Sequence, residues 1–167
     1  MDRDEIGPIC HCGHNCACAG GVHSYADHYA EIIRTYKPGI ILEWGPGKNT
    51  EIALESGARV FSIEHEEAYA RRYSKHDNYQ CFIEEVKSDE YISLHNINAD
   101  LYFVDGRRRS ECLRSIFEKA TGDYVVCLHD AQRSRYRDAI GLFKNVKFLN
   151  GGFAMMENHE LAKKCNV

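Results

Sequence analysis

The chain has 167 residues, which is enough for one hydrophobic core and too few for two independent domains. Hydrophobic residues make up 44% of the chain and charged residues 28%, a composition typical of a globular protein, so a disordered or fibrous chain is excluded. The formal net charge of −4 gives no overall basic field, which argues against non-specific binding to nucleic acid or anionic lipid.

No apolar run approaches the roughly 18 residues that cross a bilayer. The first five residues, MDRDE, also lack the basic and then apolar pattern of a targeting sequence. We therefore expect a cytoplasmic protein with no membrane partner. In that reducing compartment the scattered cysteines should be free thiols, and these are Cys81, Cys112, Cys127 and Cys165.

The remaining cysteines form a cluster near the N-terminus, in an arm that we assign to residues 1–21. Thiolates at this density can close a tetrahedral zinc site, so the candidate zinc ligands are Cys10, Cys12, Cys16 and Cys18. The close C-x-C spacing leaves a soft-metal or iron–sulfur site, disulfides formed on oxidation, and an arm without a ligand open as alternatives. The arm could also fold over a ligand site as a lid.

After the arm, short β-rich apolar runs alternate with amphipathic stretches, which predicts a parallel sheet with crossover helices over residues 22–167. A helix is expected within residues 19–36. Strands are predicted over 40–44, 60–64, 80–83, 101–105 and 124–129, with helices over 50–56, 67–74 and 111–120 between them. A helix over 136–143 and a hairpin of strands 146–149 and 153–156 complete the domain.

The first predicted strand runs into a glycine turn, EWGPGKNT at residues 43–50, which a helix follows. Glycine lets the backbone turn sharply and approach a ligand, and the helix offers free N–H groups. Glu64 ends the second predicted strand, where a carboxylate can accept hydrogen bonds from ribose hydroxyls. Glu43 suits a ligand with a cationic amino group, such as S-adenosylmethionine. The alternative is a turn that serves only the strand-to-helix geometry.

Charged side chains follow the fourth and fifth predicted strands. The carboxyl ends of parallel strands meet ligands at one edge of a sheet, so we name Asp105, His129 and Asp130 as candidate catalytic residues. Two carboxylates and an imidazole can hold a divalent cation such as Mg²⁺ or Mn²⁺, or the imidazole can take a proton from an acceptor hydroxyl. The structural alternatives are a helix N-cap for Asp105 and a turn position for Asp130.

Arginines are concentrated in the same two loops. Guanidinium groups bind phosphate and carboxylate through paired hydrogen bonds, which predicts a small anionic acceptor. The candidate substrate-binding residues are Arg107, Arg109, Arg133 and Tyr136. Few aromatic residues accompany the arginines, so a nucleic-acid partner is not favoured. A solvated charged face is the alternative.

The turn at 43–50 together with residues 62–66 (SIEHE) resembles the cofactor-binding half of class I S-adenosylmethionine-dependent methyltransferases. More narrowly, residues 104–107 and 128–136 resemble a small methyltransferase-like group with DGR and HD…R…Y signatures. The resemblance implies a Rossmann-like, doubly wound sheet of seven strands in the order 3-2-1-4-5-7-6, with the last strand antiparallel. The cofactor residues are then Glu43, Gly45, Gly47, Asn49, Thr50 and Glu64. The resemblance adds an acidic residue after the third strand that meets the adenine, here Glu84, with Glu85 as the alternative.

These observations favour an S-adenosylmethionine-dependent methyltransferase that acts on an oxygen of a small anionic or sugar-like acceptor. A second copy of the chain or the N-terminal arm could complete the acceptor pocket. One alternative is a non-catalytic S-adenosylmethionine- or nucleoside-binding module with a metal-binding, cysteine-rich interaction arm. A nicotinamide-dependent oxidoreductase is disfavoured, because Thr50 stands where the dinucleotide fingerprint needs a third glycine.

Overall fold

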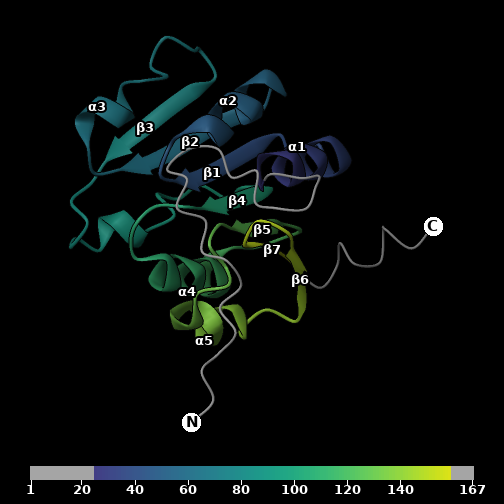
Figure 1. Cartoon of the computed structure of the whole chain (residues 1–167). Coiled ribbons are helices and arrows are strands. Elements are labelled where there is room, and N and C mark those ends of the chain that lie inside the picture. Colours follow the sequence, from purple (N-terminus) through teal and green to yellow (C-terminus); the bar gives the residue numbers. More distant parts are fainter. Residues whose placement is uncertain (1–24, 159–167) are drawn as a thin grey trace.

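The computed structural model describes residues 25–158 and contains one sheet with the strand order β3-β2-β1-β4-β5-β7-β6 (Figure 1). The strands β1 to β5 pair in parallel, and β7 runs antiparallel to both β5 and β6. This order confirms the predicted fold class, a doubly wound α/β domain with seven strands.

The bounds of the elements follow in chain order. They are α1 (Tyr25–Tyr36), β1 (Ile40–Trp44), α2 (Lys48–Glu55), β2 (Arg59–Glu64), α3 (Glu67–Ala70), β3 (Tyr79–Ile83), the 3₁₀ helix η1 (Glu90–Ile92), β4 (Leu101–Val104), α4 (Arg109–Lys119), β5 (Val125–Leu128), the 3₁₀ helix η2 (Ser134–Tyr136), α5 (Arg137–Ile140), β6 (Asn145–Leu149) and β7 (Phe153–Glu157). Among these elements, no helix is both long and apolar enough to cross a membrane.

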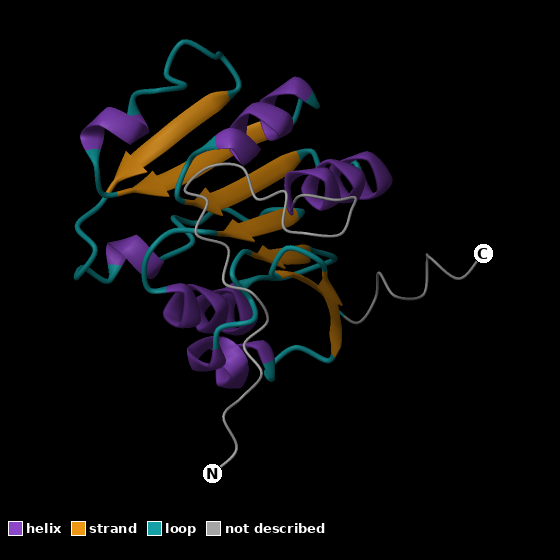
Figure 2. Ribbon diagram, viewed as in Figure 1, coloured by secondary structure: helices purple, strands orange, loops and turns teal. Residues whose placement is uncertain are grey.

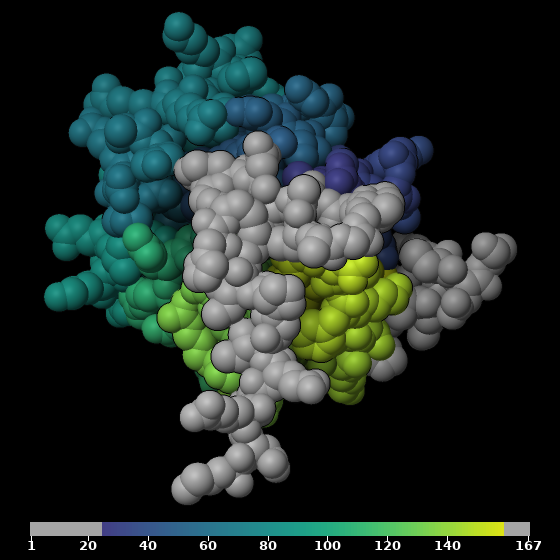
Figure 3. Space-filling view, in the orientation of Figure 1, coloured from purple at the N-terminus to yellow at the C-terminus, as the bar shows by residue number. Residues whose placement is uncertain are grey.

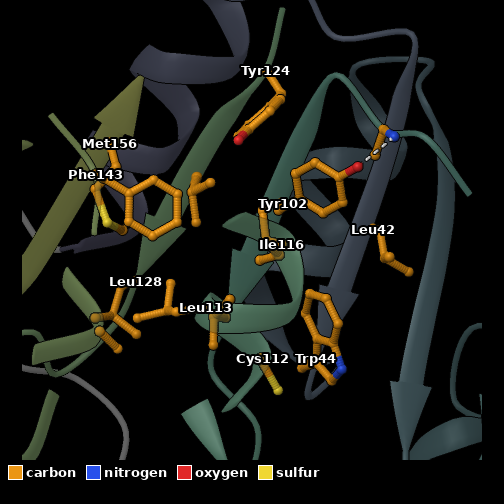
Figure 4. Packing of buried hydrophobic residues seen from close by; sticks show 14 of the residues in the cluster. Leu42, Trp44, Tyr102, Cys112, Leu113, Ile116, Tyr124, Leu128, Phe143 and Met156 are labelled. Atoms are coloured by element: carbon orange, nitrogen blue, oxygen red, sulfur yellow. Dashed lines mark hydrogen bonds between the residues drawn. The ribbon is translucent and has the colours of Figure 1, made fainter. Parts of the chain in front are cut away.

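Helices cover both faces of the sheet and bury two hydrophobic clusters (Figure 2). On one face, α1 turns an apolar stripe at helical spacing, Tyr29, Ile32 and Ile33, toward the sheet. On the other face α4 buries Leu113 and Ile116 against the strands (Figure 4). The four residues of β4 and of β5 are all buried, as expected for central parallel strands that are covered on both sides.

The helix after β2 is shorter than the sequence pattern predicts. Residues 67–74 should form one helix, but α3 ends at Ala70 and turns follow. The backbone hydrogen bonds change there from four-residue to three-residue spacing, and the Ser74 hydroxyl donates to the Arg71 carbonyl. Such local side-chain bonds compete with a helix. The helix predicted over 136–143 is likewise replaced by η2 and the short α5.

The register of the parallel strands brings their carboxyl ends to one edge of the sheet. Trp44 at the end of β1 pairs with Ile63 of β2 and with Val104 of β4, and Val104 pairs with Leu128 at the end of β5. The arrowheads of these strands point to the same side of the domain (Figure 2). The loops after β1, β2, β4 and β5 therefore converge at this edge. The outermost strands of the sheet, β3 and β6, lie at opposite ends of the molecule (Figure 3).

Candidate functional site

The glycine turn between β1 and α2 is shaped by two glycines with different roles. Gly45 has φ of +86°, and a Cβ there would lie 3.0 Å from the backbone of Gly106, so neither conformation nor space allows a side chain. Gly47 is extended, with φ of −168°, and a Cβ there would meet nothing within 4 Å among residues 25–158. Gly47 thus leaves open space beside the start of α2, where a ligand can approach.

Below this turn lies a buried carboxyl group. Oε1 of Glu43 accepts hydrogen bonds from Thr50 Oγ1 at 2.7 Å and from Ser62 Oγ at 2.5 Å, and Thr50 Oγ1 accepts one from the Gly47 N–H at 2.8 Å. Glu43 is fully buried. Burial raises the pKa of its carboxyl to about 7, while the serine and threonine hydrogen bonds oppose that rise. Glu43 therefore holds the turn from inside through Oε1, and its direct contact with a ligand amino group stays a prediction.

The first turn of α2 contains the other polar residues of the motif. The helix begins at Lys48, two residues earlier than predicted, so Asn49 and Thr50 both belong to it. Asn49 is 3% exposed, and its amide oxygen and nitrogen have no hydrogen-bond partner among the described residues. A buried amide without partners is costly unless something else satisfies it. Together with the open side of Gly47, it fits a ligand that has both hydrogen-bond donors and acceptors, such as an amino acid moiety.

Two carboxylates follow the neighbouring strands. Glu64 at the end of β2 is 7% exposed, and its Oε1 accepts from the backbone N–H groups of His65 at 2.7 Å and Glu66 at 2.9 Å. The Glu84 N–H donates to the Glu64 carbonyl at 2.9 Å, which places Glu84 beside it. Glu84 Oε1 lies 3.7 Å from His95 Nε2. That these carboxylates contact a ribose and an adenine stays a prediction.

The loops after β4 and β5 bring together a histidine and an aspartate. His129 Nδ1 lies 2.9 Å from Asp105 Oδ1. With its Nδ1 proton donated to this carboxylate, the imidazole presents Nε2 as a hydrogen-bond acceptor. The ring of Tyr25, at the start of α1, stacks on the imidazole with 4.0 Å between ring centroids. Both β4 and β5 end one residue earlier than predicted, so Asp105 and His129 lie in loops at the sheet edge.

Arg109 lies between the two candidate catalytic carboxylates. It forms ion pairs of 2.9 Å with Asp105 and 3.0 Å with Asp130, and its remaining N–H groups donate to the carbonyl oxygens of Asp105, Gly106 and His129. Arg109 is thus engaged within the fold, and its contact with an acceptor stays a prediction. The N-cap of α4 is Arg108, in the left-handed region with φ of +47°, so Asp105 is not the cap.

The other predicted substrate-binding residues differ in exposure. Arg107 is exposed, and Arg133 is largely exposed while it pairs with Asp130 at 2.8 Å. Tyr136 is 5% exposed, and its hydroxyl accepts from Arg135 Nη2 at 2.8 Å. The Tyr136 side chain thus packs inside the domain, and its contact with substrate stays a prediction. Arg107 and Arg133 remain available to an anionic acceptor.

The structure also tests the predicted metal sites. Within residues 25–158, no group of three or more histidine, cysteine, aspartate or glutamate side chains could hold a metal ion. Asp105, His129 and Asp130 do not form such a site, since the Arg109 guanidinium lies between the carboxylates. The predicted zinc ligands Cys10, Cys12, Cys16 and Cys18 lie outside the described residues.

Sequence reasoning missed several residues that shape this edge. Tyr25 reaches His129 from α1, and Tyr73, after α3, donates a hydrogen bond to the Gly47 carbonyl at 2.7 Å. Tyr91 accepts one from the Arg107 N–H at 2.8 Å. Each tyrosine lies far along the chain from its partner, so local sequence spacing does not predict these contacts. Ser62 in the neighbouring predicted strand could have indicated a partner for Glu43, since a buried carboxylate needs donors.

No protein-family model matches this chain, and no curated protein matches it in sequence. Solved structures share its fold. A methyltransferase-like protein from Silicibacter pomeroyi is 19% identical with a TM-score of 0.63, over 80% of this chain and 84% of that one. A Podospora anserina methyltransferase in its SAH-bound form is 13% identical, with a TM-score of 0.62 over 81% and 78% of the two chains. An O-methyltransferase from Streptomyces achromogenes, in complex with SAM, is 12% identical, with a TM-score of 0.61 over 81% and 80%.

The chain therefore has the Rossmann-like fold of S-adenosylmethionine-dependent methyltransferases. At these identities the likeness shows the fold alone. The narrower likeness to the group with DGR and HD…R…Y signatures stays a prediction.

Proposed function

We propose that this chain is a methyltransferase that binds S-adenosylmethionine and methylates an oxygen of a small anionic or sugar-like acceptor. The observation that carries the proposal is the pairing of His129 with Asp105 at the sheet edge that also presents the open turn at Gly47. In doubly wound sheets ligands bind at this edge. The fold that the chain shares with SAM- and SAH-bound methyltransferases supports the same cofactor.

The residues at this edge suit the separate parts of the cofactor. The space beside Gly47, the N-terminus of α2 and the amide of Asn49, which has no partner in the described part of the chain, would hold its methionine moiety. Glu64 and Glu84 would hold its ribose and base. When bound, the sulfonium of the cofactor supplies an electrophilic methyl group.

The chain's own residues then have defined tasks. Nε2 of His129 would take the proton from the acceptor hydroxyl as the acceptor oxygen bonds to the methyl group, whose bond to sulfur breaks to leave a neutral thioether. Asp105 would stabilise the imidazolium that forms. The exposed guanidinium groups of Arg107 and Arg133 hold the anionic part of the acceptor. Much of the rate would come from holding the acceptor oxygen close to the methyl group and in line with it.

Cofactor binding is tested by calorimetric titration of the full chain with S-adenosylmethionine. Gly47→Val fills the open space without backbone strain, because an extended φ suits any residue. We expect binding by the wild type and at least a tenfold loss in this variant. The matched control is Gly39→Ala, just before β1 at the amino ends of the parallel strands, where a Cβ makes an ordinary 3.5 Å contact with Asp100. Absence of binding by the wild type would reject the proposal.

Methyl transfer is tested with tritiated cofactor and a panel of phosphorylated and carboxylated hydroxy compounds. We expect turnover by the wild type and a loss of roughly 10²- to 10⁴-fold in His129→Asn, which cannot act as a base. The cofactor affinity of His129→Asn should stay unchanged. Cofactor binding without turnover on any acceptor would favour the non-catalytic binding module instead.

A further inference from the structure

Arg109 occupies the position that the sequence assigned to a divalent cation. We infer that its guanidinium is the permanent cation of this site, in place of a metal ion, and that it positions Asp105 and, through Asp105, the imidazole of His129. Its effect on methyl transfer rests on the proposed function, whereas its effect on metal binding does not.

The geometry uses the whole guanidinium group. Nε donates to the Gly106 carbonyl at 3.0 Å, Nη1 to the His129 carbonyl at 2.6 Å and to Asp130 Oδ2 at 3.0 Å, and Nη2 to the Asp105 carbonyl at 3.0 Å. Nη2 also lies 2.9 Å from Asp105 Oδ1. Of the five N–H donors of a guanidinium, four make these hydrogen bonds, and Nη2 also forms the ion pair with Asp105. The side chain is only 12% exposed, so little of it is left for an outside anion.

The charges of the cluster already balance. Asp105 and Asp130 carry two negative charges, and Arg109 and Arg133, which pairs with Asp130 at 2.8 Å, carry two positive ones. A guanidinium stays charged throughout the physiological pH range. A divalent cation would add charge to a balanced cluster and would have to displace Arg109 from both carboxylates.

The imidazole nitrogen on the side of the two carboxylates is also engaged. A metal ligand must offer a nitrogen lone pair, but His129 Nδ1 faces Asp105 Oδ1, the same oxygen that contacts Arg109. Beside Asp130 stands Ala131, which has no ligand atom. Removal of the Arg109 side chain would release the carboxylates of Asp105 and Asp130 from their shared cation, and carboxylate oxygens are donors that Mn²⁺ accepts.

The experiment measures Mn²⁺ binding to the full chain from the electron paramagnetic resonance signal of free Mn²⁺, without cofactor or acceptor. The proteins are the wild type, Arg109→Met, Asp130→Asn and the double variant. We expect equal Mn²⁺ binding by the wild type and Asp130→Asn, since Asp130 is not a metal ligand. Arg109→Met should bind Mn²⁺ at least tenfold more tightly than the wild type does. The double variant should bind Mn²⁺ no more tightly than the wild type. Binding elsewhere in the chain cancels in these comparisons.

Either of two results would overturn the inference. One is Mn²⁺ binding by the wild type that Asp130→Asn weakens, and the other is no gain in a folded Arg109→Met. Folding is checked by the fluorescence of Trp44, the single tryptophan, which is fully buried. If Arg109→Met does not fold, the wild-type comparison with Asp130→Asn still decides. None of these measurements depends on methyl transfer, so a failed proposed function would leave them intact.

Discussion

The phenol ring of Tyr25 stacks on the imidazole of His129, with the centroids 4.0 Å apart and the planes at 26°. Burial raises the pKa of the Tyr25 hydroxyl, and the nearby charges of Asp105 and Asp130 raise it further, so the phenol stays neutral. Tyr25 therefore covers one face of the imidazole while Asp105 fixes its Nδ1 edge. Two contacts from different elements thus determine where Nε2 points.

We expect Tyr25→Leu to lower kcat for methyl transfer about tenfold and to leave the affinity for S-adenosylmethionine unchanged. An aromatic stack contributes about 0.5–1.5 kcal/mol, which is enough to hold one orientation of the ring. Tyr25→Phe keeps the stack and should keep most of the activity. Initial rates at saturating cofactor measure both effects, and equal losses in the two variants would mean that the hydroxyl matters rather than the stack.

Gly106 is packed too closely for any side chain. A Cβ there would lie 2.6 Å from the Tyr91 hydroxyl and 3.1 Å from Trp44. We expect Gly106→Ala to lower the free energy of unfolding by about 1–3 kcal/mol, as overpacking does. The measurement is urea unfolding followed by Trp44 fluorescence.

Tyr91→Phe tests the cause of that loss. The variant removes the oxygen that the new methyl group would strike, although it also removes the acceptor of the Arg107 N–H. The double variant should therefore be more stable than the sum of the two single losses implies. If the stability losses of the two single variants simply add in the double variant, the Tyr91 hydroxyl is not the group that the new methyl group strikes.

Most of the fold could be predicted from the sequence, because apolar runs of strand length and glycine-bounded amphipathic stretches determine it locally. All seven strands lie where these patterns predict them, and the strand order is the one that the family resemblance implies. The errors fall where local hydrogen bonds compete with a helix, as after Ala70 and around Tyr136. A hydrophobic pattern does not distinguish a turn with a buried side chain from another turn of helix.

The site was only partly predictable. Position in the sheet brought Asp105 and His129 together as expected, since both follow strands that are neighbours. The partner of each charged group could not be read from spacing. Arg109 contacts carbonyl groups of two loops, and Glu43 faces inward to Thr50, so both side chains act within the fold.

Tyr73 fixes the glycine turn from a neighbouring segment. Its hydroxyl donates to the Gly47 carbonyl at 2.7 Å and lies 3.1 Å from Glu51 Oε1. We expect Tyr73→Phe to lower the free energy of unfolding by about 0.5–1.5 kcal/mol and to weaken cofactor binding several-fold. Calorimetric titration and urea unfolding measure the two effects. Tyr69→Phe, at an exposed position of α3, is the control, and an equal loss of affinity there would contradict the role of Tyr73.

The buried carboxyl of Glu43 should make stability depend on pH. Its pKa rises from 4.5 to about 7 in the folded state, mainly through burial. Between these values the folded chain holds a proton that the unfolded chain has lost, so this contribution to stability is complete below pH 4.5 and is lost as the pH rises to about 7. At 1.36 kcal/mol per pKa unit, the loss is about 3 kcal/mol.

Glu43→Gln should remove this loss, because a glutamine amide stays neutral and its oxygen can still accept from Thr50 and Ser62. Relative to the wild type, the free energy of unfolding of the variant should increase by about 3 kcal/mol between roughly pH 5 and pH 8. Urea unfolding at both pH values gives the difference, in which titrations common to both proteins cancel. Glu55→Gln, at an exposed position of α2, is the control. An equal change in that control would mean that the pH effect is not specific to Glu43. A difference between Glu43→Gln and the wild type that stays constant across the pH range would mean that Glu43 is already ionised in the folded protein at pH 5.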